Sequence, residues 1–258
     1  MIRGLYTSAM GMAGQLKRMD VVSNNLANAG TSGFKRDVVI TQSFSDVLMR
    51  RVRDYNMRGF NTTTALGPAS LGLIINSIHR DFSAGSLQPT GGPLDLALEG
   101  VGFFQIMIQS GEEEPVFMFT RDGSFTLNEE GTLVTSGGHT VLSASGNPIT
   151  IPGGDILITD TGHIMVNGTL VDNIGIFSFE DTAELRPFGE NFYTITEEAE
   201  IIPFAGRVIQ GYVETSNVNS VREMVEMISL SRAYEANSRM VQIADQTLGQ
   251  AVNEIARP

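Results

Sequence analysis

The chain has 258 residues, of which 41% are hydrophobic and 18% charged, with a formal net charge of −12 and no cysteine. This length suits one large domain or two small ones, and the composition supports a buried core rather than wholesale disorder. The negative charge argues against a general nucleic-acid binder, because affinity for phosphates comes mainly from clustered Lys and Arg. Without cysteine there is no disulfide, thiolate nucleophile or Cys-ligated metal.

A heptad pattern runs through residues 2–29, where apolar or small residues alternate at spacings of four and three. The members of this stripe are Leu5, Ala9, Met12, Leu16, Met19, Ser23 and Leu26. The run Asn28-Ala29-Gly30 then indicates the end of a helix, and Gly33 indicates a second break. Because no long apolar block is present here, we expect neither a cleaved secretory signal nor membrane insertion.

The middle of the chain changes character twice. Residues 38–76 have weak periodicity, which predicts a short helix followed by an extended connector. From Leu94 to about Phe179, short β-branched or aromatic runs alternate with turn residues, which indicates an antiparallel meander, sandwich or small barrel. Within this region, Asp122-Gly123 lies between Val116–Arg121 and Ser124–Leu127 and predicts a β-hairpin.

A second long helical region is predicted over residues 217–256. Ser220 and Glu223 have the spacing of a capping box at its start. Its apolar stripe again alternates at three and four, and Val221, Val225 and Ile228 widen this stripe in the first turns. The members of the stripe are Met227, Leu230, Tyr234, Asn237, Val241, Ala244, Leu248, Ala251 and Ile255.

These regions predict an α+β fold in which long N- and C-terminal helices form a coiled-coil-like assembly domain around an inserted all-β antiparallel body. The assembly domain comprises residues 1–37 and 217–258, the connector 38–76, and the β-rich outer domain 77–216. Each terminal helix has an apolar stripe that must be buried. The pattern leaves two interpretations open: the stripes pack on each other and on other copies, or they pack on the protein's own sheet.

A search for catalytic chemistry gives no candidate. The three histidines, His79, His139 and His163, have no metal-ligand spacing, and the chain carries neither a nucleophile elbow nor a phosphate-binding loop. Acidic runs at Glu112–Glu114 and Glu197–Glu200 could supply paired carboxylates, but they are more typical of solvated hairpin tips. We therefore expect no enzyme activity, no catalytic residue, no metal and no cofactor.

Four separated stretches resemble the signatures of the flagellar rod and hook family. The first begins in the last turns of the heptad helix and continues beyond it, Ser23-Asn-Asn-Leu-Ala-Asn-Ala-Gly-Thr-Ser-Gly-Phe-Lys-Arg36. Two lie in the β region, Leu94-Asp-Leu-Ala-Leu-Glu-Gly-Val-Gly-Phe-Phe-Gln105 and Phe119-Thr-Arg-Asp-Gly-Ser-Phe125. The last is Gly211-Tyr-Val-Glu-Thr-Ser-Asn-Val-Asn219 with Met224-Val-Glu-Met-Ile228 and Arg232-Ala-Tyr-Glu-Ala-Asn237. In this order the stretches cover essentially the whole chain.

The resemblance implies a structural subunit of the bacterial flagellar basal-body rod, assembled as a helical tube that transmits torque from motor to hook. It implies that the terminal helices line the tube, with polar side chains fixing their register. The residues expected at the assembly interface are Leu5, Met12, Leu16, Met19, Asn24, Asn25, Leu26, Asn28, Asn217, Val221, Met227, Leu230, Tyr234, Asn237, Val241 and Leu248.

The resemblance also implies partners: copies of the chain, other rod proteins, hook protein, the flagellar type III export apparatus and envelope ring proteins, with no nucleic acid. It places the protein in the basal body, exported without a cleaved signal peptide. Its motifs fit both the proximal and the distal rod type. Two alternatives stand beside it: a secreted β-rich carbohydrate-binding protein that uses the acidic loops, and a filament or adhesin protein from another system.

Overall fold

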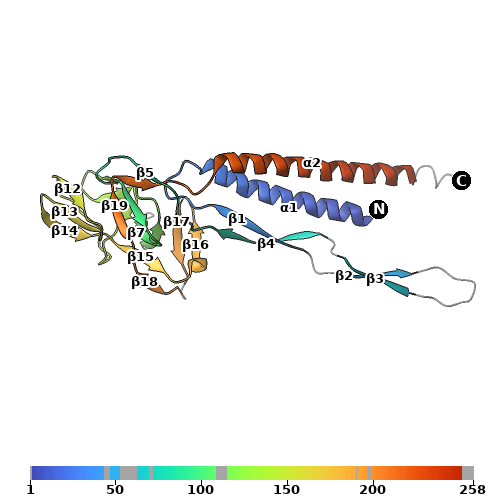
Figure 1. The fold of residues 1–258 in the computed structure, drawn as a ribbon, viewed down its shortest axis with the longest axis horizontal. Coiled ribbons are helices and arrows are strands. Elements are labelled where there is room, and N and C mark those ends of the chain that lie inside the picture. The colour runs from blue at the N-terminus through green and yellow to red at the C-terminus, as the bar shows by residue number, and fades with distance from the viewer. Residues whose placement is uncertain are drawn as a thin grey trace, which may run out of the picture. The chain divides into compact units, whose positions relative to one another are not determined.

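The computed structural model describes residues 2–43, 47–52, 63–69, 72–108, 115–189, 191–196 and 199–251 (Figure 1). The chain divides into two compact units. The helix–ribbon unit comprises Met1–Leu26, Asp37–Arg80 and Ser220–Pro258, and the body comprises Ala27–Arg36 and Asp81–Asn219. The order of helix, β-rich region and helix confirms the predicted α+β class. The structure groups residues 37–80 with the helices, whereas the sequence suggested a separate connector.

Both predicted terminal helices are present. α1 (Ile2–Ala27) ends where Asn28-Ala29-Gly30 was expected to stop it, and the carbonyl of Asn28 accepts a turn bond from the N–H of Thr31 at 3.1 Å. α2 (Ser220–Gln250) begins at the predicted Ser220 and runs for 31 residues. No helix among the described residues is both long and apolar enough to cross a membrane.

The short helix predicted within residues 38–76 is wrong for the described part of that segment, which forms two antiparallel strand pairs. β1 (Asp37–Ser43) pairs with β4 (Leu73–Arg80), and β2 (Val47–Val52) pairs with β3 (Thr63–Ala69). β1 is rich in β-branched residues, and these favour the pleated conformation over the helix when a partner strand is available. Residues 53–62, between β2 and β3, lie outside the described residues.

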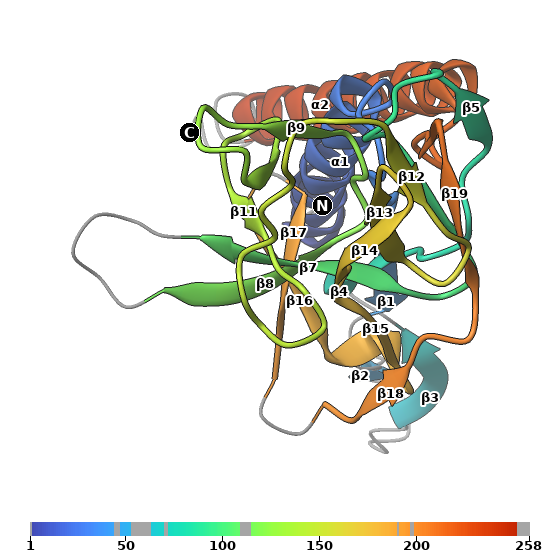
Figure 2. The same cartoon turned by 90° about the vertical axis from the view of Figure 1, so that its left-hand side faces the viewer.

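A seven-strand path of antiparallel neighbours forms the main sheet of the body, with β7 and β8 side by side near its middle (Figure 2). In spatial order its strands are β16 (Leu185–Phe188), β17 (Phe192–Ile195), β8 (Val116–Thr120), β7 (Phe103–Ile108), β11 (Thr140–Val141), β10 (Leu133–Thr135) and β9 (Phe125–Leu127). β15 (Ile176–Phe179) also pairs with β7 and carries β18 (Ile201–Pro203), and a short 3-10 helix (Thr182–Glu184) follows β15.

Three smaller antiparallel sheets complete the body. Their strands are β12 (Ile156–Ile158), β13 (His163–Val166) and β14 (Thr169–Asn173) in the first, β19 (Arg207–Gln210) and β6 (Leu96–Glu99) in the second, and β20 (Tyr212–Glu214) and β5 (Leu87–Pro89) in the third. The predicted antiparallel, all-β character of the body is therefore confirmed. Strands from both ends of the body's sequence pair with each other, since β19 and β20 bind β6 and β5.

The hairpin predicted around Asp122-Gly123 is wrong, because β8 and β9 pair with other strands instead of with each other. Asp122 turns the chain by accepting the N–H of Ser124 at 3.0 Å, and the carbonyl of Gly123 accepts the N–H of Leu96 at 3.0 Å. A Cβ at Gly123 would collide with the carbonyl oxygen of Leu96. The glycine therefore serves a close approach between two chain segments, which the local turn pattern alone does not distinguish from a hairpin.

Two clusters of buried apolar side chains hold the body together. The larger one spreads over most strands and includes Leu96, Phe104 and Ile164. The smaller one is aromatic, with Phe103 and Tyr193 rings 5.5 Å apart and Phe82 packed against both. Edge-to-face packing of such rings adds stabilisation beyond the burial of their area.

Candidate assembly interface

α1 and α2 contact each other within the helix–ribbon unit. Asn25 Nδ2 lies 3.4 Å from Glu223 Oε2, and Arg18 Nη2 pairs with Glu226 Oε1 at 3.1 Å. Farther along, a Cβ added at Gly11 would lie 3.0 Å from Asn237 Nδ2. Residue numbers fall along α1 while they rise along α2, so the helices run antiparallel, side by side (Figure 1).

The contacting residues of α1 form a row of their own, because Gly11, Arg18 and Asn25 are seven residues apart. At 100° per residue this row lies on a different side of the helix from the middle of the apolar stripe predicted from the sequence. In that predicted stripe, Leu16 is 47% exposed, whereas four other members are partly buried. Those partly buried members are Leu5, Met12, Met19 and Leu26. A search for apolar periodicity misses this row, because its members are a glycine, an arginine and an asparagine. The signal available in the sequence was the heptad spacing of these three residues, together with acidic residues on α2 that can bind two of them.

The predicted stripe of α2 is its less exposed side. Leu230 is buried, and the other described members that were predicted at the interface are partly buried. Those members are Met227, Tyr234, Asn237, Val241 and Leu248.

A second apolar face is exposed on the first turns of α2. Val221 is 69% and Val225 is 63% exposed, and Met224 and Ile228 are about half exposed. Residues at spacings of three, four and seven share one side of a helix, and at 100° per residue this side is opposite the Leu230 stripe. α2 therefore presents apolar side chains on two sides. A helix with this property is typical of the interior of a larger assembly.

Asn25 connects the end of α1 to the beginning of β1. Its Nδ2 donates to the carbonyl of Asp37 at 2.8 Å, and its Oδ1 accepts the N–H of Asp37 at 2.9 Å. The side chain is buried, so these two bonds are protected from water. Arg80 is the residue of β4 that pairs with Asp37, and it binds the Asp37 carboxylate through Nε at 2.7 Å and Nη2 at 2.8 Å.

The other asparagines predicted at the interface differ in their surroundings. Asn24 is exposed, and Asn28 accepts the hydroxyl of Thr31 at 3.3 Å within the body. Asn217 also belongs to the body, where its Oδ1 accepts the N–H of Arg36 at 2.8 Å and its Nδ2 donates to the carbonyl of Asp81 at 2.8 Å. The structure thus gives Asn217 a role inside the subunit, joining the segments that precede β1, follow β4 and precede α2.

Three buried charges from separate sequence motifs meet in the body and form what we call the charge cluster: Lys35, Arg121 and Glu214. Lys35 Nζ donates to Glu214 Oε1 at 2.6 Å, and Arg121 Nε donates to Glu214 Oε2 at 2.9 Å. Lys35 Nζ also donates to the carbonyl of Ser83, and Arg121 Nη1 to those of Gly100 and Gly102. The side chains of the cluster are 1–4% exposed.

The protonation of the charge cluster follows from this burial. Burial by itself would raise the pKa of Glu214, but Arg121 and Lys35 outweigh it and hold that pKa below its ordinary value. Burial lowers the pKa of Lys35, and Glu214 offsets only part of this effect. Sequence reasoning missed the cluster; the available signal was that a lysine, an arginine and a glutamate lie within three of the quoted motifs.

Gly33 lets the N-terminal segment reach the cluster. Its φ is +66°, and its N–H donates to the carbonyl of Glu214 at 2.7 Å. A Cβ at this position would lie 2.5 Å from the carbonyl carbon of Arg121. The predicted break at Gly33 is therefore confirmed, and the glycine is needed both for its backbone angle and for the close approach.

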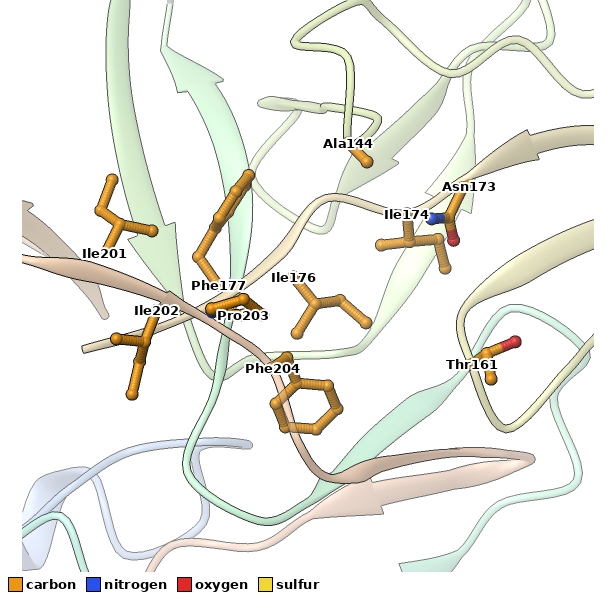
Figure 3. A pocket seen from close by; sticks show the side chains of 10 residues that line it. All are labelled: Ala144, Thr161, Asn173, Ile174, Ile176, Phe177, Ile201, Ile202, Pro203 and Phe204. Atoms are coloured by element: carbon orange, nitrogen blue, oxygen red, sulfur yellow. The ribbon is translucent and has the colours of Figure 1, made fainter. Parts of the chain in front are cut away.

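An apolar hollow of about 400 Å³ lies between β15, β18 and neighbouring loops of the body (Figure 3). Ile176, Phe177 and Phe204 line it, and its polar side chains, Thr161 and Asn173, are at one end. Neither of these two is an acid, a base or an activated nucleophile, so this lining provides no reaction chemistry.

The described residues contain no group of three or more His, Cys, Asp or Glu side chains that could hold a metal ion. His139 is partly buried and meets the Phe192 ring edge-on at 5.1 Å between centroids. The acidic residues Glu112–Glu114, Glu197 and Glu198 lie outside the described residues.

The fold and these contacts define a class of protein: an α+β subunit whose two terminal helices pair with each other, with the ribbon strands and the antiparallel body between them in sequence. Three family models match it in order. They are "Flagella basal body rod protein" over residues 5–35, "Flagellar hook protein FlgE/F/G D1 domain" over 97–172, and "Flagellar basal body rod FlgEFG protein C-terminal" over 209–254.

Similar proteins match over nearly their whole length. The chain is 34% identical to the flagellar basal-body rod protein FlgG of Buchnera aphidicola subsp. Acyrthosiphon pisum, over 96% of this chain and 98% of that protein. It is 35% identical to the FlgG protein of Borreliella burgdorferi, over 98% of each. It is 30% identical to the rod protein FlgF of Caulobacter vibrioides, over 100% of this chain and 99% of that protein. The chain therefore belongs to the flagellar basal-body rod protein family and is a structural subunit of the basal body.

Proposed function

We propose that this subunit assembles with copies of itself and with neighbouring rod proteins into a helical tube that transmits torque from motor to hook. The observation that carries the proposal is the second apolar face of α2, formed by Val221, Met224, Val225 and Ile228. Full burial of an aliphatic side chain of this size is worth about 1.5–3 kcal/mol. Four such side chains on one helix face are a strong reason for association with another chain.

The antiparallel helix pair supports different roles for the two sides of α2. One side of α2 is used within the subunit, against the row of Gly11, Arg18 and Asn25 on α1. The opposite side of α2, together with the exposed Leu16 of α1, is left for neighbours. We propose that the predicted interface residues on these surfaces contact adjacent subunits, and that the body carries no catalytic role and determines which neighbours are met. Hook protein and envelope ring proteins are the further partners proposed.

Export through the flagellar type III apparatus, without a cleaved signal peptide, is part of this proposal. The absence of cysteine supports it, because no disulfide has to be formed or broken during passage. The membership in the rod family gives the destination, the basal body, but the relatives bear both the FlgG and the FlgF name.

The proposal is tested by replacing Val225 with Asp and following rod assembly and swimming. We expect Val225→Asp to abolish both, because an aspartate buried in a helix interface is strongly unfavourable. The matched control is Leu157→Asp, since Leu157 is 58% exposed in the body. The purified variants should both retain wild-type helix content and melting. Normal assembly of the Val225→Asp subunit would refute the proposed use of this face.

A further inference from the structure

The three members of the charge cluster come from widely separated points of the chain, and the single carboxylate comes last. Lys35 and Arg121 precede it by 179 and 93 positions, respectively. Glu214 Oε1 also accepts the N–H of Gly85 at 2.7 Å. Segments that are synthesised early therefore all bind one residue that is synthesised late.

The backbone at Glu214 closes the same region. Its carbonyl accepts the N–H of Gly33, and β20, which ends at Glu214, pairs with β5. The next residue, Thr215, donates its N–H to the carbonyl of Ser86 at 2.8 Å. The side chain and the main chain of one short segment thus join the N-terminal part of the body to its middle.

We propose that Glu214 is the latch of the body: the body stays open during synthesis until Glu214 is present, because closing earlier would bury Lys35 and Arg121 without a counter-charge. A buried ion pair that loses one partner is strongly destabilised, because the remaining charge is out of water and uncompensated. Here one missing carboxylate would leave two buried cations. The inference concerns the time at which the body folds, so it goes beyond the assembly function and does not depend on it.

Ribosome-bound chains of increasing length, all beginning at residue 1, test the latch by limited proteolysis. Cleavage of the body should be fast in every chain whose residue 214 is still inside the ribosome. It should become slower by about tenfold once that residue has emerged, since cleavage follows the population of the open form. Protection of the body in shorter chains would overturn the proposal.

Two variants separate the charge from the strand that carries it. The released full-length Glu214→Gln chain should lack this protection, whereas Glu226→Gln, in the partly exposed pair with Arg18, should keep it. The double variant Lys35→Met with Arg121→Met has no cations to compensate, so its ribosome-bound chains should gain protection before residue 214 emerges. The charge latch is wrong if the body of Glu214→Gln is as protected from proteolysis as that of the unchanged chain. It is also wrong if the body of the double variant becomes protected only after residue 214 has emerged.

Discussion

Gly11 of α1 lies against the side chain of Asn237 of α2, so closely that a Cβ at Gly11 would come within 3.0 Å of the Asn237 amide nitrogen. Glycine in the middle of a helix costs about 1 kcal/mol relative to alanine. At this position the cost is offset by a close approach of the two helices. The pair thus combines a small residue on one helix with a polar one on the other, where the sequence pattern suggested an apolar seam.

Replacing Gly11 with Leu should separate the helices at this point. A leucine has to displace the Asn237 side chain, and overpacking of this kind costs about 1–3 kcal/mol. We expect faster hydrogen exchange of amides in the last turns of α2, with little change in the body. Gly4→Leu is the matched control, because nothing lies within 4 Å of a Cβ at Gly4. Equal exchange in the two variants would contradict the close approach.

Asn25→Ala should destabilise the helix–ribbon unit by about 1–3 kcal/mol, because it leaves the N–H and carbonyl of Asp37 without their buried partner. Denaturant unfolding, followed by the circular dichroism of the helices, measures the change. Asn24→Ala, on the exposed side of the same turn, serves as the control and should change stability by much less. If the two substitutions lower the free energy of unfolding equally, the hydrogen bonds between Asn25 and the main chain of Asp37 do not contribute significantly to stability.

Glu214 should make the stability of the body decrease at acidic pH. Its folded-state pKa is held below the ordinary value of 4.5 by Arg121 and Lys35, against the opposing effect of burial. The folded chain therefore keeps the carboxylate ionised at a pH where the unfolded chain binds a proton. The stabilisation is complete above pH 4.5 and is lost as the pH falls through the folded-state pKa.

Thermal melting from neutral to acid pH measures this dependence. Glu214→Gln should lower stability at neutral pH by about 3–5 kcal/mol, since it leaves two buried cations uncompensated, and should flatten the decline below pH 4.5. Glu226→Gln should cost less than about 1 kcal/mol, because its pair with Arg18 is partly exposed. An unchanged acid slope in Glu214→Gln would assign the decline to other groups, such as Asp81, whose pKa is also lowered, chiefly by a bond from the Ser83 N–H.

Gly33→Ala should destabilise the body by about 2 kcal/mol or more, because a positive φ and a collision with backbone atoms act together. The atoms it meets belong to Arg121 and Asp122, whose main chain cannot rotate away as a side chain would. Gly30→Ala is the control, since no atom lies within 4 Å of a Cβ there. Comparable melting temperatures would contradict the need for glycine at residue 33.

The elements that the sequence predicted well are those whose signal is local and long. α1 and α2 were expected from their heptads, α1 ends and α2 begins near the expected residues, and the antiparallel character of the body followed from its frequent turns. Strand pairing was less predictable: Asp122-Gly123 has the residues of a hairpin turn, but the carbonyl of Gly123 is used by Leu96. The pairing of β1 with β4 was also missed, because the two strands are distant from each other in the sequence.

The candidate interface was predicted in part for the same reason. Apolar periodicity identified the residues that can be buried, but it did not determine which row faces α1 or α2 within one subunit. The row of Gly11, Arg18 and Asn25 depends on complementary residues on α2, which one helix alone does not reveal. The charge cluster likewise depends on three segments that only the folded body brings together.

Leu16 and Val241 were expected to act alike in assembly, but the structure separates them. Leu16 is 47% exposed and, at 100° per residue, lies on the side of α1 opposite the contact row, whereas Val241 is partly buried on the side of α2 that carries Leu230. We therefore expect Leu16→Asp to leave the helix pair of the isolated subunit intact while blocking assembly. Val241→Asp should loosen the pair as well, because burying a charge there is unfavourable even within one subunit.

Hydrogen exchange of the purified subunits and rod assembly in cells measure the two effects separately. Leu16→Asp should keep the exchange rates of the unchanged chain and yet form no rods, and Val241→Asp should exchange faster along α2 and form no rods. Lys17→Asp is the control for added negative charge on an exposed position of α1. Rods formed by the Leu16→Asp subunit would show that the exposed side of α1 does not contact a neighbour, and the proposed tube wall would then rest on α2 alone.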